Sequence, residues 1–497
     1  MDEKKEDNTP AALFMTSDRD AHRRLIVKPA RDKYRYGQNV TLMWTNEGCI
    51  RVWKSSGGGA ESEIHSGVQL YLTGPLSLRI EPVAVSSSKI RFTATGAADD
   101  YNGDRVEDSV SAFTYDLTLS GIKFNHNTSS SANDGINLRR SFSDPFSIPN
   151  GEWTAADGAL APVCYKINQP VTVKAKFKTH SSLLTSARIS AENPNGDSGE
   201  PHCFQAFGAQ TVSFSNGQTG DILFTMQGTA PSAISLLEQE HLEWKASRIN
   251  GDTKAADVCI TNSGPHKVYV ILGNPVEPWS NVANNNQNAW TNALEMALRM
   301  AGCSGQTTDE GTLSQISQFL FSGHGLCYDT MSGMCSYVVL NLYNRMAAMN
   351  FHGYLDKASG NVVNCYDQAA GVTLFGRLLG INADFCFMAP FGYINTTRLV
   401  GVTQNCNNPF YNNPSCANHS ATVGLDDILP NRTPFGNHAF VSYNGKIFDA
   451  CAGPALGTQT PAQYVNDVID RSTPAEASEA GGVSDIIIFP NMFMIDE

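Results

Sequence analysis

Residues 364–381 read NCYDQAAGVTLFGRLLGI, and this stretch decides how the carboxy-terminal half of the chain folds. Asn364 is a favourable N-cap, and Asp367 stands three residues later, as in a capping box. Small and apolar residues then recur at three- and four-residue spacing up to a glycine, which is typical of a buried helix face: Ala369, Val372, Phe375, Leu379 and Gly380. We therefore predict a helix whose first turn carries Cys365.

The predicted position of Cys365 favours reactivity. Backbone N–H groups and the positive end of the helix dipole meet at the first turn of a helix, where they lower the pKa of a thiol and favour the thiolate. The alternative is a buried cysteine that lies at a helix start for packing reasons alone. Cys365 becomes a candidate nucleophile only if a base lies near it.

A second stretch, NHAFVSYNGKIFDAC at residues 437–451, supplies that base. Asn444-Gly445 between two alternating runs predicts a two-residue hairpin in which Tyr443 pairs with Lys446. In this register one face carries His438, Phe440, Asp449 and Cys451. The other face is apolar and is predicted to pack on the core; it carries Ala439, Val441, Phe448 and Ala450.

His438 and Asp449 are diagonal neighbours in this hairpin, roughly 7 to 8 Å apart at the backbone, and their side chains can close that gap. A carboxylate on one imidazole nitrogen fixes the tautomer and leaves the other nitrogen for the thiol proton. Cys451 faces His438 and is a rival nucleophile, but a strand interior does not activate a thiol as a helix start does. The alternative is that His438 and Asp449 are exposed residues of an ordinary hairpin without a catalytic role.

These motifs together resemble the transglutaminase-like superfamily. The resemblance rests on the cysteine helix and on the histidine and aspartate strands of residues 350–452: Cys365, Asp367, Ala369, Leu378-Leu-Gly-Ile381, His438-Ala-Phe, Asn444-Gly445 and Ile447-Phe-Asp449. It implies a papain-related α+β core with Cys365 as nucleophile, His438 as base and Asp449 as the residue that orients the base. Tyr366 departs from the tryptophan that cross-linking members usually carry. The backbone N–H of Cys365 is the one oxyanion donor that we name.

The resemblance implies a cysteine-dependent acyl transfer on peptide or side-chain amides through a thioester, with no cofactor required for catalysis. We expect hydrolysis, as in a protease or deamidase, because the β-barrels that follow the core in animal cross-linking enzymes have no room after residue 497. The alternatives are a cross-linking transglutaminase and a non-catalytic binding protein built on β-sandwiches. A delivered toxin or effector would use the same chemistry.

The amino-terminal half predicts two Ig-like β-sandwich modules, because short alternating runs are broken by Gly, Pro, Asn and Asp. We expect a disordered segment at 1–22, β modules at 23–120 and 121–272, and the α+β catalytic domain at 273–497. Three- and four-residue spacing also predicts helices at 290–301 and 336–349. The strands expected in the first module are 25–27, 40–44, 50–53, 68–72, 76–80, 90–94 and 113–117.

One acidic segment of the first module resembles the short calcium loops of extracellular repeats. Asp100, Asn102, Asp104 and Asp108 place side-chain oxygens at alternating positions, as calcium requires. Arg105 stands where such loops usually carry a glycine, and Asn102-Gly-Asp104 is also ordinary turn chemistry. We expect a structural calcium ion or an acidic turn.

Composition limits the partners. The formal net charge of -13 opposes binding to a phosphate backbone, so we do not expect nucleic acid as a partner. The resemblance implies a protein or peptide substrate. The charged first residues contain no signal-peptide core, and the apolar runs are too short to span a bilayer. With 12 cysteines and no Sec signal, we expect a reduced cytoplasmic protein or export by a signal-independent route.

Overall fold

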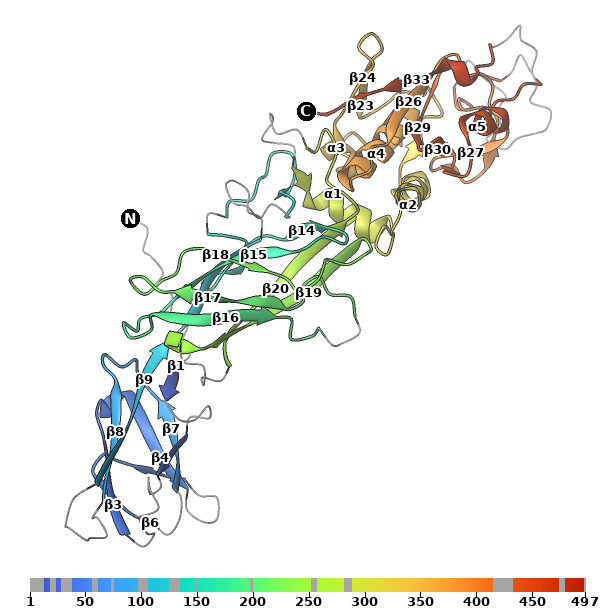
Figure 1. Cartoon of the computed structure of the whole chain (residues 1–497). Coiled ribbons are helices and arrows are strands. Elements are labelled where there is room, and N and C mark those ends of the chain that lie inside the picture. The colour runs from blue at the N-terminus through green and yellow to red at the C-terminus, as the bar shows by residue number, and fades with distance from the viewer. Residues whose placement is uncertain are drawn as a thin grey trace.

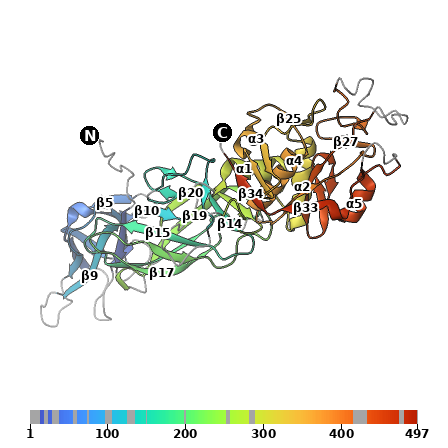
Figure 2. The same ribbon diagram turned by 90° about the horizontal axis from the view of Figure 1, so that it is seen from above.

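The computed structural model is mostly β-sheet with few helices. In Figure 1 the amino-terminal strands lie at one end of an elongated molecule and the helices gather at the other, and Figure 2 shows the same order from above. The structure describes residues 13–17, 24–27, 38–55, 61–72, 76–96, 106–124, 135–148, 150–196, 200–251, 257–280, 288–413, 432–472 and 479–495.

The first pair of sheets encloses a small core of its own. One sheet has the order β1 (Leu13–Ser17), β9 (Val106–Asp116), β8 (Ile90–Gly96), β3 (Gln38–Trp44), β6 (Val68–Leu72). The other has the order β2 (Arg24–Val27), β7 (Leu76–Pro82), β4 (Ile50–Ser55), β5 (Glu61–Ile64). Their inward residues include Leu42, Val52 and Ile90, which are fully or almost fully buried. In β4, buried Ile50 and Val52 flank exposed Arg51, which is the alternation that a sandwich requires.

The second pair of sheets is larger. One sheet has the order β13 (Gly158–Ala159), β12 (Trp153–Thr154), β10 (Thr118–Lys123), β15 (Thr172–Lys178), β18 (Ile222–Thr225). The other has the order β14 (Val163–Lys166), β20 (Val258–Ile271), β19 (Ser235–Ser247), β16 (Ser186–Glu192), β17 (Phe207–Ser213). Val173, Phe177 and Trp244 belong to the core of this pair.

The carboxy-terminal part combines helices with a five-stranded sheet. The sheet has the order β32 (Ala455–Leu456), β30 (Lys446–Asp449), β29 (His438–Tyr443), β26 (Asp384–Met388), β33 (Ile486–Phe489). The helices are α1 (Thr291–Glu295), which continues as a π-helix over Met296–Met300, α2 (Asp309–Ser322), α3 (Phe351–Asp356), α4 (Cys365–Leu378) and α5 (Pro461–Val468). None of the helices that the structure describes is long and apolar enough to cross a membrane.

Small sheets complete this part of the chain. They are β23 (Val338–Asn341), β24 (Met346–Met349) and β34 (Asn491–Met494); β28 (Asn405–Cys406), β27 (Thr397–Leu399) and β31 (Ala452–Gly453); β22 (Cys327–Tyr328) with β25 (Val362–Val363); and β11 (Leu138–Arg139) with β21 (Ala289–Trp290). The pair β11 and β21 is parallel and joins residues on both sides of position 272.

The largest hydrophobic core also crosses position 272. It contains Tyr269 and Ile271 of β20 together with Trp290 and the buried residues of α4. Two backbone hydrogen bonds join Ile234 to the loop before α2, at 2.8 and 2.9 Å. The second pair of sheets therefore has a core of its own between its sheets, and it also contributes residues of β20 to the core of the helical part.

Each of the seven strands expected in the first module overlaps a strand of the structure, and the helix expected at 290–301 is present as α1 and its π-helical extension. Two expectations were wrong. Residues 336–349 form the hairpin β23–β24, with Arg345 at a φ of 47° in its turn, because small and apolar residues alone do not distinguish a helix from a strand. Leu13–Ser17 lie in β1, paired with β9, inside the segment expected to be disordered.

Candidate active site

Helix α4 begins at Cys365, as the sequence predicts. The side chain of Asn364 accepts hydrogen bonds from the backbone N–H groups of Tyr366 and Asp367, at 2.8 and 3.3 Å, and the reciprocal bond to Asp367 completes a capping box. Asn364 also donates from Nδ2 to the carbonyl of Gly333 at 3.0 Å. The first turn that carries Cys365 is thus fixed from both sides.

Asp367 has a second role that the sequence does not show. Its carboxylate accepts hydrogen bonds from the backbone N–H groups of Asn364, Ser336 and Tyr337, at 2.9 to 3.1 Å. Burial raises the pKa of Asp367 to about 6, although these N–H donors oppose the rise. The carboxylate therefore ties the start of α4 to the chain that enters β23.

Gln368 holds α4 against the segment that follows Asp449. Its Nε2 donates to the carbonyls of Leu320 and Ala450, at 2.9 and 3.0 Å, and its Oε1 accepts from the hydroxyl of Tyr354 at 2.7 Å. Gln368 is completely buried, so each of these bonds is costly to lose. The cysteine helix and the hairpin are therefore held together one turn from Cys365.

The predicted hairpin register is present. Tyr443 pairs with Lys446, and Asn444 and Gly445 have φ values of 51° and 71°, as a two-residue turn of type I′ requires. The face predicted to be apolar is buried, but the opposite face is buried too. Tyr464 of α5 covers it, with its ring centroid 5.0 Å from that of Phe440.

Asp449 accepts a hydrogen bond from His438 and is fixed by three further donors. Its Oδ2 lies 2.9 Å from Nε2 of His438 and 2.6 Å from the hydroxyl of Tyr464. Its Oδ1 accepts from the backbone N–H groups of Cys451 and Ala452, at 2.7 and 3.1 Å. Because a carboxylate only accepts, Nε2 carries the proton and the tautomer of the neutral imidazole is set.

Nδ1 of His438 is buried and has no hydrogen-bond partner among the residues that the structure describes. Burial disfavours the charged imidazole, but the Asp449 carboxylate and the nearby Cys365 thiol outweigh it and raise the pKa of His438 to about 10. The thiol of Cys365 lies close enough to His438 to contribute to this rise. Nδ1 is therefore the nitrogen available to Cys365.

Aromatic rings close the site. The ring centroids of Phe391 and Phe435 lie 4.7 and 5.3 Å from that of His438. Cys365 is 4% exposed and His438 is 0% exposed. A substrate therefore reaches the thiol only after covering side chains move.

Cys451, the rival nucleophile, lies in a less favourable environment. Burial raises the pKa of its thiol well above the ordinary value, and electrostatic interactions with Cys365, Asp449 and Asp367 add to the rise. A buried thiol beside carboxylates stays protonated and unreactive.

Sequence reasoning missed Tyr464 and Gln368. Thr460, Pro461 and Gln463 form a start signal for α5, and the structure shows the corresponding capping box, but nothing local links that helix to Asp449. Such contacts depend on tertiary packing between distant segments.

The expected calcium site falls largely outside the described residues. Asp100, Asn102 and Asp104 lie there, while Asp108 belongs to β9 and its backbone pairs with Ala94 of β8. Calcium stays a prediction. Within the described ranges, no cluster of three or more His, Cys, Asp or Glu side chains is suited to a metal ion.

Comparison with known proteins finds matches among solved structures alone. No family model matches the chain, and no curated protein matches it. Among solved structures, the crystal structure of red sea bream transglutaminase matches with a TM-score of 0.29 and 10% sequence identity. The match covers 59% of this chain and 49% of the other, so it spans about half the length of that transglutaminase.

Proposed function

We propose that the chain is a cysteine-dependent acyl-transfer enzyme with Cys365 as nucleophile, His438 as base and Asp449 as the residue that orients His438. One observation carries the proposal. His438 is bound through Nε2 to a fixed carboxylate, its buried Nδ1 has no hydrogen-bond partner among the described residues, and Cys365 at the start of α4 lies close enough to raise the pKa of the imidazole. A buried nitrogen without a hydrogen-bond partner lowers the stability of the fold. A thiol that shares its proton with this nitrogen offsets the loss.

The chemistry follows from this arrangement. The sulfur of Cys365 attacks an amide carbonyl carbon while His438 holds the thiol proton on Nδ1. The backbone N–H of Cys365, at the start of α4, stabilises the oxyanion of the tetrahedral intermediate. His438 then gives its proton to the departing amine, and a thioester remains. Water completes a hydrolysis, whereas a lysine amine completes a cross-link.

In this proposal, residues 273–497 form a transglutaminase-like catalytic domain behind two β-sandwich modules. The order of cysteine helix, histidine strand and aspartate strand in one α+β unit supports it. We place hydrolysis of peptide or side-chain amides first and cross-linking second. The products distinguish the two.

The test uses the full chain and glutamine-containing protein substrates. Mass spectrometry follows peptide cleavage and deamidation, and a fluorescent primary amine reports cross-linking. We expect at least one of these products from the wild type and none from Cys365→Ala. Cys386→Ala is the matched control, because Cys386 is also buried, lies on β26 of the central sheet, and has its pKa raised to about 12 by burial and the nearby Asp384.

Activity that survives Cys365→Ala would exclude Cys365 as the nucleophile. Loss of activity in Cys451→Ala alone would transfer that role to Cys451. The absence of every product from the wild type would favour the non-catalytic binding protein.

A further inference from the structure

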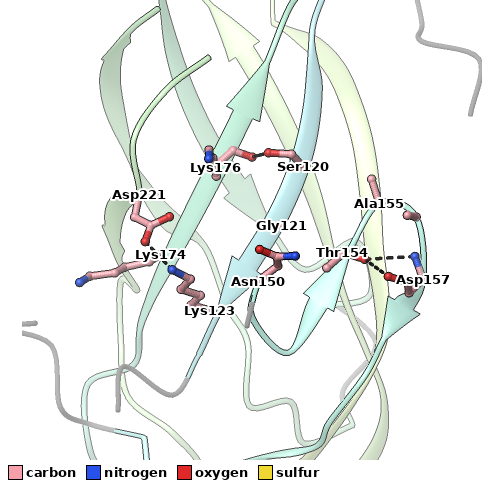
Figure 3. A pocket seen from close by; sticks show the side chains of 11 residues that line it. Ser120, Gly121, Lys123, Asn150, Thr154, Ala155, Asp157, Lys174, Lys176 and Asp221 are labelled. Carbon is pink, nitrogen blue, oxygen red and sulfur yellow. Dashed lines mark hydrogen bonds and ion pairs between the residues drawn. The ribbon is translucent and has the colours of Figure 1, made fainter. Parts of the chain in front are cut away.

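A polar pocket of about 320 Å³ lies on the sheet of β12, β10 and β15, apart from the residues of the candidate active site. Figure 3 shows its lining side chains. Val173, Ala175 and Phe177 of β15 point into the core, so the alternating Lys174 and Lys176 project from the opposite, outer face. The pocket is therefore part of the outer surface of the second pair of sheets.

An irregularity of β10 shapes the pocket. The register between β10 and β15 shifts between Leu119 and Gly121, which leaves Ser120 in a bulge whose hydroxyl donates to the carbonyl of Lys176 at 2.8 Å. Gly121 stands opposite Lys176, and a Cβ there would lie 3.1 Å from the carbonyl oxygen of Asn150. The absence of a side chain at Gly121 leaves the floor of the pocket open. Bulges often occur where a sheet forms a binding site.

The lysines of the pocket are incompletely neutralised. Lys123 stands directly opposite Lys174, and like charges in that position destabilise a sheet. Asp221 pairs with Lys123 at 2.7 Å. Lys174 is half-buried and Lys176 is exposed, and neither has an ion-pair partner within the part of the chain that the structure describes. An acid group placed beside them would relieve the repulsion.

The other lining groups restrict the class of ligand that carries the acid group into the pocket. Asp157 accepts a hydrogen bond from the Thr154 hydroxyl at 3.0 Å, and it shares the pocket with the side-chain amide of Asn150. These groups bind hydroxyls, and the two carboxylates of the pocket disfavour a highly charged anion. Among its side chains, alanines are the only apolar ones, so an apolar ligand gains little.

We propose that this pocket binds an acidic sugar residue, with its carboxylate between Lys174 and Lys176 and its hydroxyls toward Asn150 and Asp157. The volume lies at the lower end of the range for small-ligand sites, which suits one sugar unit with its immediate attachments. The second β module would then tether the chain to an acidic glycan.

The test is a calorimetric titration of the full chain at low ionic strength with glucuronate, glucose and acetate as separate probes. We expect saturable binding of glucuronate that is at least tenfold tighter than that of glucose, which lacks the acid group, or of acetate, which lacks the hydroxyls. The double variant Lys174→Gln, Lys176→Gln should weaken glucuronate binding at least tenfold.

Lys166→Gln is the matched control, because Lys166 is a half-buried lysine on β14 of the opposite sheet, and it should leave glucuronate binding unchanged. Three results would overturn the proposal: no saturable binding of glucuronate, equal affinity for acetate or glucose, or undiminished binding in the double variant.

Discussion

At the scale of single residues, the candidate site depends on how Asp449 is held. Four donors fix its two oxygens, and one of them is the imidazole of His438. The carboxylate can therefore orient the ring without moving itself. Its geometry supports the role of an orienting residue, as in a catalytic triad.

Asp449→Asn should lower kcat/KM by at least about a hundredfold while the chain stays folded, because an amide at this position stabilises the wrong imidazole tautomer. Preferential labelling of Cys365 should weaken as well, because Nδ1 then carries the proton and cannot accept one from the thiol. Asp309→Asn is the control: Asp309 accepts from Tyr443 on the same hairpin but does not contact His438. An Asp449→Asn variant with full turnover would show that another residue orients the histidine.

The raised pKa of His438 predicts a pH dependence of stability. The folded pKa of about 10 lies above the ordinary 6.5, so the stabilisation by protonated His438 is fully present below about pH 6.5 and is lost as the pH rises through about 10. The difference in unfolding free energy between the wild type and His438→Gln should therefore shrink over this window by more than about 1 kcal/mol. Urea titrations at several pH values measure it, and a constant difference would contradict the protonated pair.

At the scale of elements, the local sequence predicts those caps and turns that depend on neighbouring residues alone. The capping box of α4 and the Asn444-Gly445 turn each depend on a few neighbouring residues, and both are present in the structure. The covering of the hairpin's second face by Tyr464 depends on a segment that follows later in the chain. Residues 336–349 form a hairpin and not the expected helix, because their apolar residues fit both the helical and the strand spacing.

The capping of α4 provides a test at this scale. Asn364→Ala removes the acceptor for two backbone N–H groups, so it should cost about 1 kcal/mol of stability and slow the labelling of Cys365 as the first turn frays. Thr308→Ala removes the matching cap of α2, where Thr308 accepts from the N–H of Gly311, and should cost a similar amount without slowing the labelling. Equal labelling rates in the two variants would show that the helix start does not activate the thiol.

At the scale of the whole molecule, the cores predict which parts unfold together. The first pair of sheets has its own core, whereas the largest core crosses position 272. Calorimetry should therefore resolve two transitions, one for the first β module and one shared by residues 121–272 and 273–497. A fragment of residues 273–497 that keeps the native melting temperature would contradict a stabilising role for the contact between β20 and the helical part.

Competitive thiol labelling tests the central claim most directly. The full chain is treated with a small electrophile at mildly acidic pH, and mass spectrometry quantifies labelling at each of the 12 cysteines. Exposure alone would favour Cys259, which is exposed, over the buried Cys365. We predict that Cys365 reacts first and that His438→Gln abolishes its advantage, because the histidine takes the thiol proton. Preferential labelling of Cys259 or Cys451, with Cys365 unreactive, would contradict the proposed nucleophile.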